Sequence, residues 1–311
     1  MSSGGRSHTA PPASGRAPVN LPRLAEMKAN GEPIVMVTAY DYPSATVAEA
    51  AGVDIVLVGD SAAMVVLGHP GTEQVSIEEM IVLGKAVRRG LKTPLMVGDM
   101  PMGSYESSNE LAVQSAQRLV KETGCQVVKL EAGGIAVERA RAIVRSGIPV
   151  MGHVGLTPQT ATALGGYKAQ GKTAKDAIAL CEDALALQSV GCFAIVFEAV
   201  PAAITEAIVA KLDIPSIGIG AGPLTSGQVL VFHDLLGITT GHMAKFVKRY
   251  ADVHGTMVEA VERYGAEVRS HHFPEPEHMY SVEPAELDEF RRYLDHESLA
   301  SQKAWEWEPL P

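Results

Sequence analysis

The central part of the chain alternates short apolar runs with longer Ala-rich stretches, and no other feature restricts the possible folds as strongly. Runs of Val, Ile and Leu without polar alternation are typical of strands buried on both faces of a parallel sheet. We predict strands at 34–38, 55–59, 95–98, 127–130, 148–151, 194–197 and 216–219, with an eighth candidate at 229–232. Helices are predicted at 43–51, 76–89, 109–122, 135–146, 174–190, 201–211 and 242–264.

Seven or eight β/α units within about 200 residues predict an α/β fold of the closed (β/α)8 type, a TIM barrel. The alternative is an open doubly wound sheet, in which a Gly-rich phosphate-binding loop follows the first strand. Here the first predicted strand is followed by Ala39-Tyr40-Asp41-Tyr42-Pro43, which contains no glycine. The barrel is therefore the favoured fold.

The two ends of the chain differ in composition from the middle. Residues 1–20 consist mainly of small residues, Gly and Pro, and such a segment buries too little surface to order itself, so we predict a disordered tail. Residues 281–311 carry eight acids and three bases, and after Pro284 apolar residues recur at helical spacing, which predicts a short amphipathic helix. The predicted organisation is a tail at 1–20, a single catalytic barrel at 21–280 and a C-terminal extension at 281–311.

Charge and composition exclude several classes of protein. The formal net charge is −10 and no Lys/Arg cluster interrupts the acidity, which argues against a nucleic-acid partner. No apolar run approaches the ~18 to 20 residues of a membrane span. The three cysteines form no C-x-x-C pair, as expected of a protein of the reducing cytoplasm.

Polar residues gather at the carboxyl ends of the predicted strands, where barrel enzymes hold their active sites. In strand order they are Tyr40-Asp41, Asp60-Ser61, Asp99, Lys129 with Glu131, His153 and Glu198. A buried charge without a partner costs several kcal/mol, so this acidic rim requires counter-charges, water or a metal ion. Oxygen ligands without cysteine suit a hard divalent cation such as Mg²⁺.

Asp60 and Asp99 follow neighbouring predicted strands, which lie about 4.8 Å apart in a sheet, so both side chains can share one ion. The alternative for each is local: Asp60 could cap a helix at 61–64, and Asp99 could accept backbone N–H groups of its own loop. Because acids follow several successive strands, we favour a common site.

Eight stretches of the sequence resemble the ketopantoate hydroxymethyltransferase family, in family order and over residues 21–280. They are TAYDYPSA at 38–45, LVGDSAAMVVLGH at 57–69, VKLEAGG at 128–134, GHVGLTPQ at 152–159, GGYKAQGK at 165–172, VFEAVP at 196–201, IPSIGIGAGP at 214–223 and FPEPEH at 273–278. The resemblance implies a metal-dependent (β/α)8 barrel of the phosphoenolpyruvate/pyruvate type. It implies transfer of a hydroxymethyl group from 5,10-methylenetetrahydrofolate to 3-methyl-2-oxobutanoate, which gives ketopantoate for pantothenate synthesis, and assembly into a ring-like homodecamer.

The resemblance also implies roles for individual residues. Asp60 and Asp99 resemble the Mg²⁺ ligands, and Glu131 a further acid of the metal site that acts through water. These two aspartates, Ser61 and Lys129 then surround the 2-oxo acid. Glu198 resembles the general base that takes the substrate proton, so that an enolate forms. The chain departs from the family at Met100-Pro101-Met102, where Leu-Pro-Phe is usual after Asp99, and so lacks an aromatic ring near the site.

Each role has a structural alternative. Glu198 could cap the helix that begins near Pro201, and Lys129 could form a salt bridge with a neighbouring acid. His153 could hydrogen-bond the enolate region or be satisfied by backbone. The glycines of Gly218-x-Gly220-x-Gly222 permit either a tight turn or close approach of the folate, and the loop at 165–171 is either a lid or a surface connection.

Two other functions remain open from the residues themselves. The first is a Mg²⁺-dependent lyase or mutase acting on a 2-oxo or phosphonate acid with the same fold and metal; dependence on tetrahydrofolate separates it from the transferase. The second is a barrel that serves only in binding or assembly. Five charged groups at one rim argue against a protein that serves only in binding or assembly, since an active site that has lost its function has no physical reason to retain them.

Overall fold

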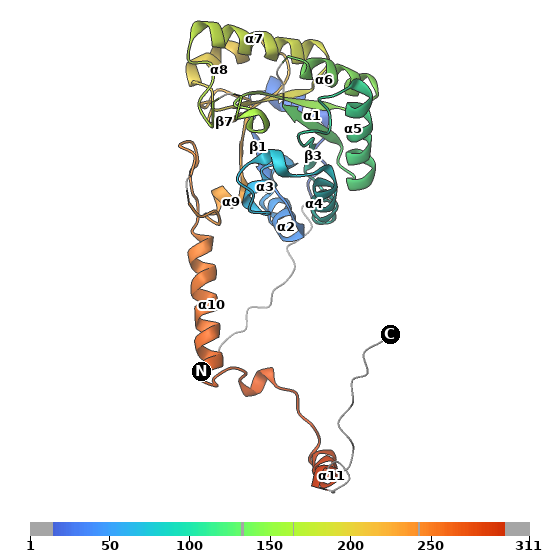
Figure 1. Ribbon diagram of the computed structural model, residues 1–311, viewed down its shortest axis with the longest axis vertical. Coiled ribbons are helices and arrows are strands. Elements are labelled where there is room, and N and C mark those ends of the chain that lie inside the picture. Colours follow the sequence, from blue (N-terminus) through green and yellow to red (C-terminus); the bar gives the residue numbers. More distant parts are fainter. Residues whose placement is uncertain (1–14, 132–133, 164, 242, 296–311) are drawn as a thin grey trace, which may run out of the picture. The chain divides into compact units, whose positions relative to one another are not determined.

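Eight parallel strands close into a barrel in the first of two units of the chain, which extends to His254 (Figure 1). The computed structural model describes residues 15–131, 134–163, 165–241 and 243–295. The strands are β1 Ile34–Thr38, β2 Ile55–Val58, β3 Leu95–Asp99, β4 Val127–Glu131, β5 Val150–Gly155, β6 Ala194–Glu198, β7 Ser216–Ile219 and β8 Gly227–Leu230. They pair in sequence order, and β8 pairs with β1, which closes the sheet. The (β/α)8 prediction is confirmed, and the open sheet is excluded.

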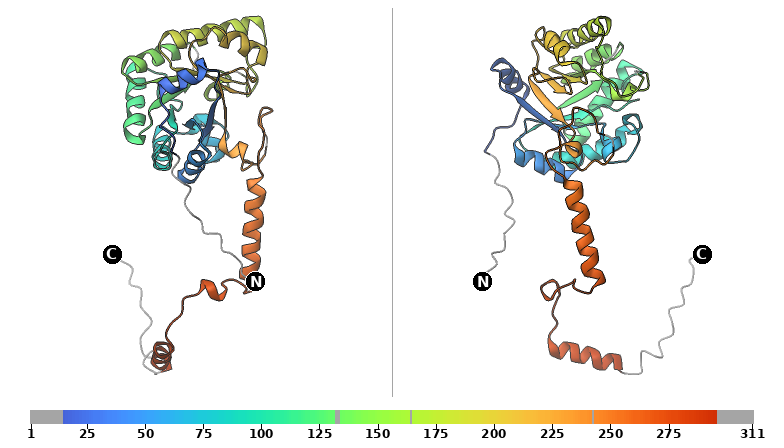
Figure 2. Two further views of the ribbon diagram at one scale, coloured as in Figure 1. Left: turned by 180° about the vertical axis from the view of Figure 1, so that it is seen from behind. Right: turned by 90° about the vertical axis from the view of Figure 1, so that its left-hand side faces the viewer.

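Six helices follow strands β1 to β6. They are α2 Tyr42–Ala51, α4 Ile77–Gly90, α5 Asn109–Thr123, α6 Ala136–Arg145, α7 Ala174–Ser189 and α8 Ala202–Val209. Of these, α4 to α7 pack on the outside of the sheet along β2 to β6 (Figure 2). Capping boxes begin α2 at Asp41 and α4 at Ser76. In each, the side chain of the capping residue accepts the backbone N–H of the residue three positions later, whose own side chain accepts the N–H of the capping residue. Local sequence therefore fixes where these two helices start.

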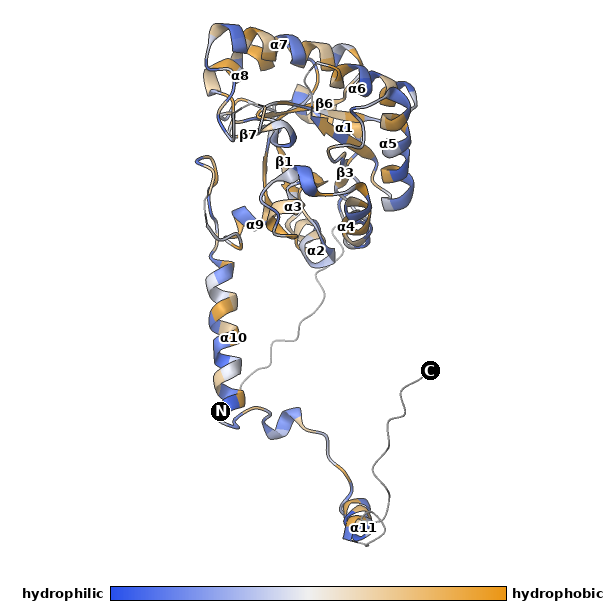
Figure 3. Ribbon diagram, viewed as in Figure 1, coloured by the Kyte–Doolittle hydropathy of each residue, from blue (hydrophilic) through white to orange (hydrophobic). Residues whose placement is uncertain are grey.

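Two apolar cores flank the strands, whose ribbons are mostly hydrophobic in Figure 3. One core lies between sheet and helices and includes Val56, Leu130 and Phe197. The other fills the barrel interior. Burial on both faces explains why β2 to β7 do not alternate between apolar and polar residues, whereas β1 and β8 each expose one residue, Val35 and Gln228.

Helix α1, Leu21–Ala29, was not predicted from the sequence. Its Leu24 and Met27 are buried in the interior core with Ile34, the first residue of β1. Asn20 caps the helix by accepting a hydrogen bond from the Arg23 backbone N–H. Just before it, Val19 is buried and its N–H donates to Thr93 O at 2.8 Å, while residues 1–14 of the predicted tail lie outside the described residues.

Two boundaries near the end of the barrel differ from the prediction. The eighth strand is Gly227–Leu230, two residues earlier than predicted, and Phe232 already begins the short helix α9, Phe232–Leu235. The helix predicted at 242–264 is wrong in its first part, because α10 covers Val253–Arg269. The N–H groups of Tyr250 and Val253 donate to Leu235 O and Leu236 O, so tertiary hydrogen bonds hold this segment in a non-helical conformation.

The remaining short elements of the first unit are α3 Ala62–Val65 and the 3₁₀ turns η1 Thr72–Gln74 and η2 Pro158–Thr160. The second unit, from Gly255, contains most of α10, the 3₁₀ turn η3 Pro276–His278 and α11 Pro284–Asp295. Helix α11 lies where the sequence predicts a short amphipathic helix. No described residue of α10 or α11 is buried, and residues 296–311 lie outside the description.

Candidate active site

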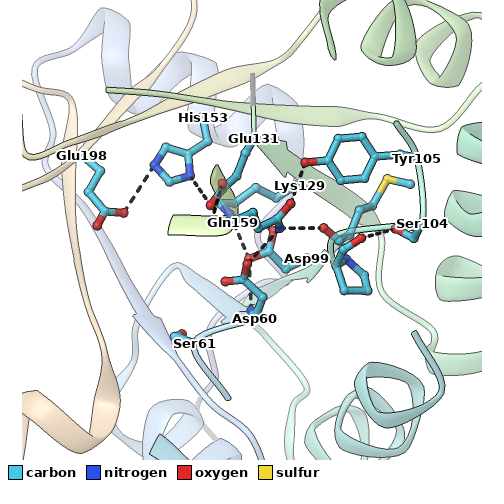
Figure 4. A network of polar contacts seen from close by, with 12 residues as sticks. Asp60, Ser61, Asp99, Ser104, Tyr105, Lys129, Glu131, His153, Gln159 and Glu198 are labelled. Atoms are coloured by element: carbon cyan, nitrogen blue, oxygen red, sulfur yellow. Dashed lines mark hydrogen bonds and ion pairs between the residues drawn. The ribbon is translucent and has the colours of Figure 1, made fainter. Parts of the chain in front are cut away.

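The carboxyl ends of β2 to β6 bring their polar side chains together at one mouth of the barrel (Figure 4). These residues are Asp60, Asp99, Lys129, Glu131, His153 and Glu198. All except Glu198 are buried, and the Glu198 side chain is 15% exposed. Residues up to 138 positions apart along the chain thus face one another in a single network. Asp41, which the sequence also places at a strand end, instead caps α2 by accepting the Ser44 N–H.

Lys129 and Asp99 form a buried ion pair across adjacent strands. The register of β3 and β4 pairs these two residues, and Lys129 Nζ donates to Asp99 Oδ1 at 2.7 Å and to Oδ2 at 2.8 Å. Burial alone would lower the pKa of Lys129, but the negative charges of Asp99, Asp60 and Glu131 outweigh it and raise this pKa. Lys129 is therefore a permanent cation whose partner in this structure is Asp99.

Asp60 is tied to Asp99 and to a glutamine of the β5 loop. Its backbone N–H donates to Asp99 Oδ2 at 3.2 Å, and Gln159 Nε2 donates to Asp60 Oδ2 at 2.8 Å. Burial, followed by repulsion from Asp99, raises the pKa of Asp60 to about 7. The capping alternative fails for Asp60, because Ser61 stands at the N-cap of α3 and no side chain caps that helix.

Glu131, His153 and Glu198 form the other half of the network. His153 Nδ1 lies 3.6 Å from Glu131 Oε1, and His153 Nε2 lies 3.3 Å from Glu198 Oε2. Neither ring nitrogen of His153 has a hydrogen bond of good geometry among the described residues, so backbone does not satisfy this histidine. Burial, and then the charge of Lys129, lower the pKa of His153, which is therefore neutral near pH 7.

Glu131 is a second acid that resists ionisation. Burial and then the charge of Asp60 raise the pKa of Glu131 well above its usual range. Its Oε2 accepts the Gln159 backbone N–H at 3.0 Å, while Oε1 has no hydrogen-bond partner among the described residues.

The capping alternative for Glu198 also fails, because Pro201 is the N-cap of α8 and no side chain makes a capping hydrogen bond there.

The sequence analysis missed two residues near the site, Gln159 and Tyr105. Gln159 lies at the centre of the network, and the buried Tyr105 donates a hydrogen bond from its hydroxyl to Gln159 Oε1 at 2.7 Å. Tyr40, which the sequence places at a strand end, lies with its OH 2.8 Å from Ser61 Oγ. Gln159 falls in a stretch that resembles the family, but it and Tyr105 are uncharged, and the search for charged strand ends passed over them.

A cavity of about 1120 Å³ opens over the network. Asp60, Lys129 and Glu198 are among its lining residues, with Tyr167 from the 165–171 loop and Phe246 from the segment after α9. Single ligand sites commonly occupy about 300–1,000 Å³, so this cavity lies just above the usual range. A Cβ atom at Gly220, where φ is +64°, would lie 2.5 Å from Phe246 Cδ1; this glycine therefore permits the Phe246 ring to pack there.

The residues at this mouth fit a hard divalent cation. Four carboxylates, of Asp60, Asp99, Glu131 and Glu198, face one ammonium group in a largely buried site, and Glu131 Oε1 is an unpartnered buried oxygen. The described residues contain one trio of acidic or His side chains with ligand atoms all within 4.8 Å, the exposed Glu275, Glu277 and His278. The oxygens at the mouth are more widely spaced, as expected if one of the acids contacts an ion through water.

Comparison with known proteins agrees with the geometry. The family model described as ketopantoate hydroxymethyltransferase matches residues 18–276. The chain belongs to this family. A relative from Carboxydothermus hydrogenoformans, 3-methyl-2-oxobutanoate hydroxymethyltransferase, is 51% identical over 87% of this chain and 98% of its own length. A relative from Arabidopsis thaliana, 3-methyl-2-oxobutanoate hydroxymethyltransferase 1, mitochondrial, is 50% identical over 88% of this chain and 80% of its own length.

Solved structures of low sequence identity share the barrel fold of this ketopantoate hydroxymethyltransferase family member. Phosphonopyruvate hydrolase, solved as a complex with oxalate and Mg²⁺, superposes with a TM-score of 0.54 at 13% identity over 90% of this chain and 99% of its own. At this identity the likeness is one of fold, and it agrees with the closed (β/α)8 barrel of this chain. The described part of the chain has no helix long and apolar enough to cross a membrane.

Proposed function

We propose that this chain transfers a hydroxymethyl group from 5,10-methylenetetrahydrofolate to 3-methyl-2-oxobutanoate and so forms ketopantoate, in the cavity over the carboxyl ends of β2 to β6. The reaction is that of its family, and the arrangement of charged groups in this cavity supports it. A 2-oxo acid is an anion with an adjacent keto oxygen. It therefore requires positive charge at its oxygens and a base at its C3 carbon.

Asp60 and Asp99 would hold a Mg²⁺ ion, with Glu131 acting through water, and the ion would supply part of that positive charge at the keto oxygen. Asp60 must ionise to hold a cation. Burial and then repulsion from Asp99 raise the pKa of Asp60, and a cation would offset that repulsion.

Lys129 and Ser61 are the proposed contacts to the 2-oxo acid. Lys129 remains charged in its ring of carboxylates and lies on the cavity wall, where its ammonium can balance the substrate's carboxylate or the charge that develops on the keto oxygen. Ser61 also lines the cavity, and its hydroxyl is oriented by Tyr40. These two groups orient the substrate from the side of β2 and β4.

Glu198 is the proposed general base. It is less buried than the other acids, it lines the cavity and it approaches no cation among the described residues, so its carboxylate is available to take the C3 proton. His153, neutral and 3.3 Å away, provides a donor or acceptor that can hold Glu198 in place or contact the substrate oxygen. The deprotonated C3 carbon then attacks the methylene carbon of the ring-opened folate iminium. Water afterwards replaces the folate nitrogen at that carbon, which gives the hydroxymethyl group of ketopantoate and releases tetrahydrofolate.

The single observation that carries this proposal is the convergence of four carboxylates and Lys129 beneath one cavity of about 1120 Å³. The test is to incubate the protein with 3-methyl-2-oxobutanoate, methylenetetrahydrofolate and Mg²⁺, and to measure ketopantoate by mass spectrometry. We expect product only when all three are present. Cleavage or rearrangement of the 2-oxo acid in the absence of folate, with no ketopantoate when folate is present, would favour the lyase or mutase alternative.

The folate is proposed to occupy the outer part of the cavity, and the loop at 165–171 to act as its lid. Tyr167 and Lys168 of this loop line the cavity, and Gly165, Gly166 and Gly171 adopt positive φ angles that other residues rarely tolerate. Replacing Gly166 with Ala should therefore raise KM for folate more than it lowers the rate of proton exchange at C3. Equal effects on both would argue against a lid for the folate.

We also propose that the chain forms a homo-oligomer, a decamer, in the cytoplasm. Met257, Val261, Tyr264 and Val268 recur at helical spacing on α10 and are all exposed in a single chain, which supports association. Cys125, Cys181 and Cys192 are free thiols, in keeping with a reducing compartment. Native mass spectrometry and cell fractionation test the two points; a monomer in the first or a membrane-bound fraction in the second would contradict them.

A further inference from the structure

Gln159 contacts both of the acids whose pKa values the site raises. Its side-chain Nε2 donates to Asp60 Oδ2 at 2.8 Å, and its backbone N–H donates to Glu131 Oε2 at 3.0 Å. Gln159 is 5% exposed and lies on η2, directly after β5. One residue of the β5 loop therefore connects the acid of β2 with the acid of β4.

The chemistry of its neighbours fixes the orientation of the Gln159 amide. Besides Asp60, Nε2 donates to Met100 O at 3.0 Å, so two acceptors face this end of the amide and only its NH₂ group can satisfy both. At the opposite end of the amide, Oε1 then accepts a hydrogen bond from the hydroxyl of the buried Tyr105, with 2.7 Å between the two oxygen atoms. Every polar group of the amide is thus used, and a rotation by 180° would place oxygen against oxygen.

These contacts use one oxygen of each carboxylate and leave the other without a contact to Gln159. Asp60 Oδ1 takes no part in the bonds to Gln159, and Glu131 Oε1 is buried without a hydrogen-bond partner among the described residues. Hydrogen bonds to the far oxygen of a metal-binding carboxylate restrict its rotation and keep the near oxygen in position.

We propose that Gln159 is a positioning residue for the divalent cation: it holds Asp60 through its side chain and Glu131 through its backbone, so that one oxygen of each is presented to the ion. Tyr105 supports it by fixing the amide. The inference rests on the proposed metal site. It adds that cation affinity depends on a neutral residue that contacts no ion itself.

The test is direct titration of the full-length protein with Mn²⁺, a probe for an oxygen-ligand Mg²⁺ site, with free Mn²⁺ measured by electron paramagnetic resonance. Gln159→Met keeps the length of the side chain and the backbone N–H to Glu131, but removes the amide. Loss of such an outer partner typically weakens metal binding about 10- to 100-fold, and we expect a rise in the Mn²⁺ Kd of this size. Tyr105→Phe, which keeps the amide but frees it to rotate, should fall between this variant and wild type.

Gln126→Met is the matched control. Gln126 also uses its side-chain amide to hold a neighbouring strand, since its Oε1 accepts the Met96 N–H at 2.9 Å, but it precedes β4 and so lies at the opposite end of the barrel. We expect wild-type Mn²⁺ affinity for this variant. Circular dichroism and thermal unfolding of all variants separate a loss of fold from a loss of cation affinity.

Kinetics give a second readout. If Gln159 positions the ligands, Gln159→Met should raise the Mg²⁺ concentration required for half-maximal rate by at least tenfold, while kcat at saturating Mg²⁺ falls less. A folded Gln159→Met and a Tyr105→Phe that both bind Mn²⁺ as tightly as wild type would overturn the inference. Failure of the metal site itself is distinct: wild type and Asp60→Ala would then bind Mn²⁺ equally weakly.

Discussion

Replacement of Glu198 by Gln tests the proposed base without changing the shape of the side chain. The variant keeps an oxygen beside His153, 3.3 Å away in the wild-type chain, but cannot accept the C3 proton of 3-methyl-2-oxobutanoate. General-base catalysis by a positioned side chain contributes about 10²–10⁴-fold, or roughly 3–5 kcal/mol of transition-state stabilisation at 1.36 kcal/mol per tenfold. The neutral His153 is the nearest group that could substitute as base, so some residual exchange is expected.

The assay follows loss of the C3 proton by NMR in deuterium oxide, with Mg²⁺ present and no folate, so that exchange is measured apart from transfer. We expect Glu198→Gln to exchange the proton at least about a hundredfold more slowly, with little change in KM. Glu206→Gln, an exposed glutamate on α8, is the matched control and should exchange at the wild-type rate. Exchange in Glu198→Gln at the rate of this control would refute the assignment of the base.

Three further predictions follow from burial and charge. Asp60→Ala should weaken Mn²⁺ binding at least tenfold by calorimetry; unchanged affinity would rule out ligation by Asp60. Because the pKa of Asp60 is raised from 3.8 to about 7 and the ion binds only the ionised form, wild-type Mn²⁺ affinity should fall about tenfold per pH unit below about pH 7; a flat profile between pH 5 and pH 7 would contradict the raised pKa. Lys129→Met leaves the buried Asp99 without its cation and should lower the free energy of unfolding by about 3–5 kcal/mol in urea titrations without metal; a loss below about 1 kcal/mol would argue against the ion pair.

The sequence is most informative where short-range rules suffice. Strands buried on both faces produce continuous apolar runs, and parallel strands end at the same rim, so the grouping of Asp60, Asp99, Lys129 and Glu131 follows from chain order alone. The residue types then indicate the chemistry. Their juxtaposition is what the structure finds, while the role of each remains a prediction for the experiments above.

The missed features depend on long-range contacts. Gln159 meets Asp60 across 99 residues, and nothing in a neutral glutamine after a proline signals that its amide is central. The segment before α10 has helical composition, yet its backbone donates to Leu235 and Leu236 instead. The alternative for Lys129, a salt bridge with a rim acid, proved correct, and it is compatible with a role at the site because Asp99 keeps the ammonium charged.

The most direct test of the account is the position of a bound ion. A crystal of the full-length protein soaked with Mn²⁺ and 3-methyl-2-oxobutanoate would locate the metal by anomalous scattering. We predict one strong peak at the barrel mouth within bonding distance of Asp60 and Asp99, with the 2-oxo acid beside it. A mouth without metal, with Mn²⁺ only at the exposed Glu275, Glu277 and His278, would contradict it.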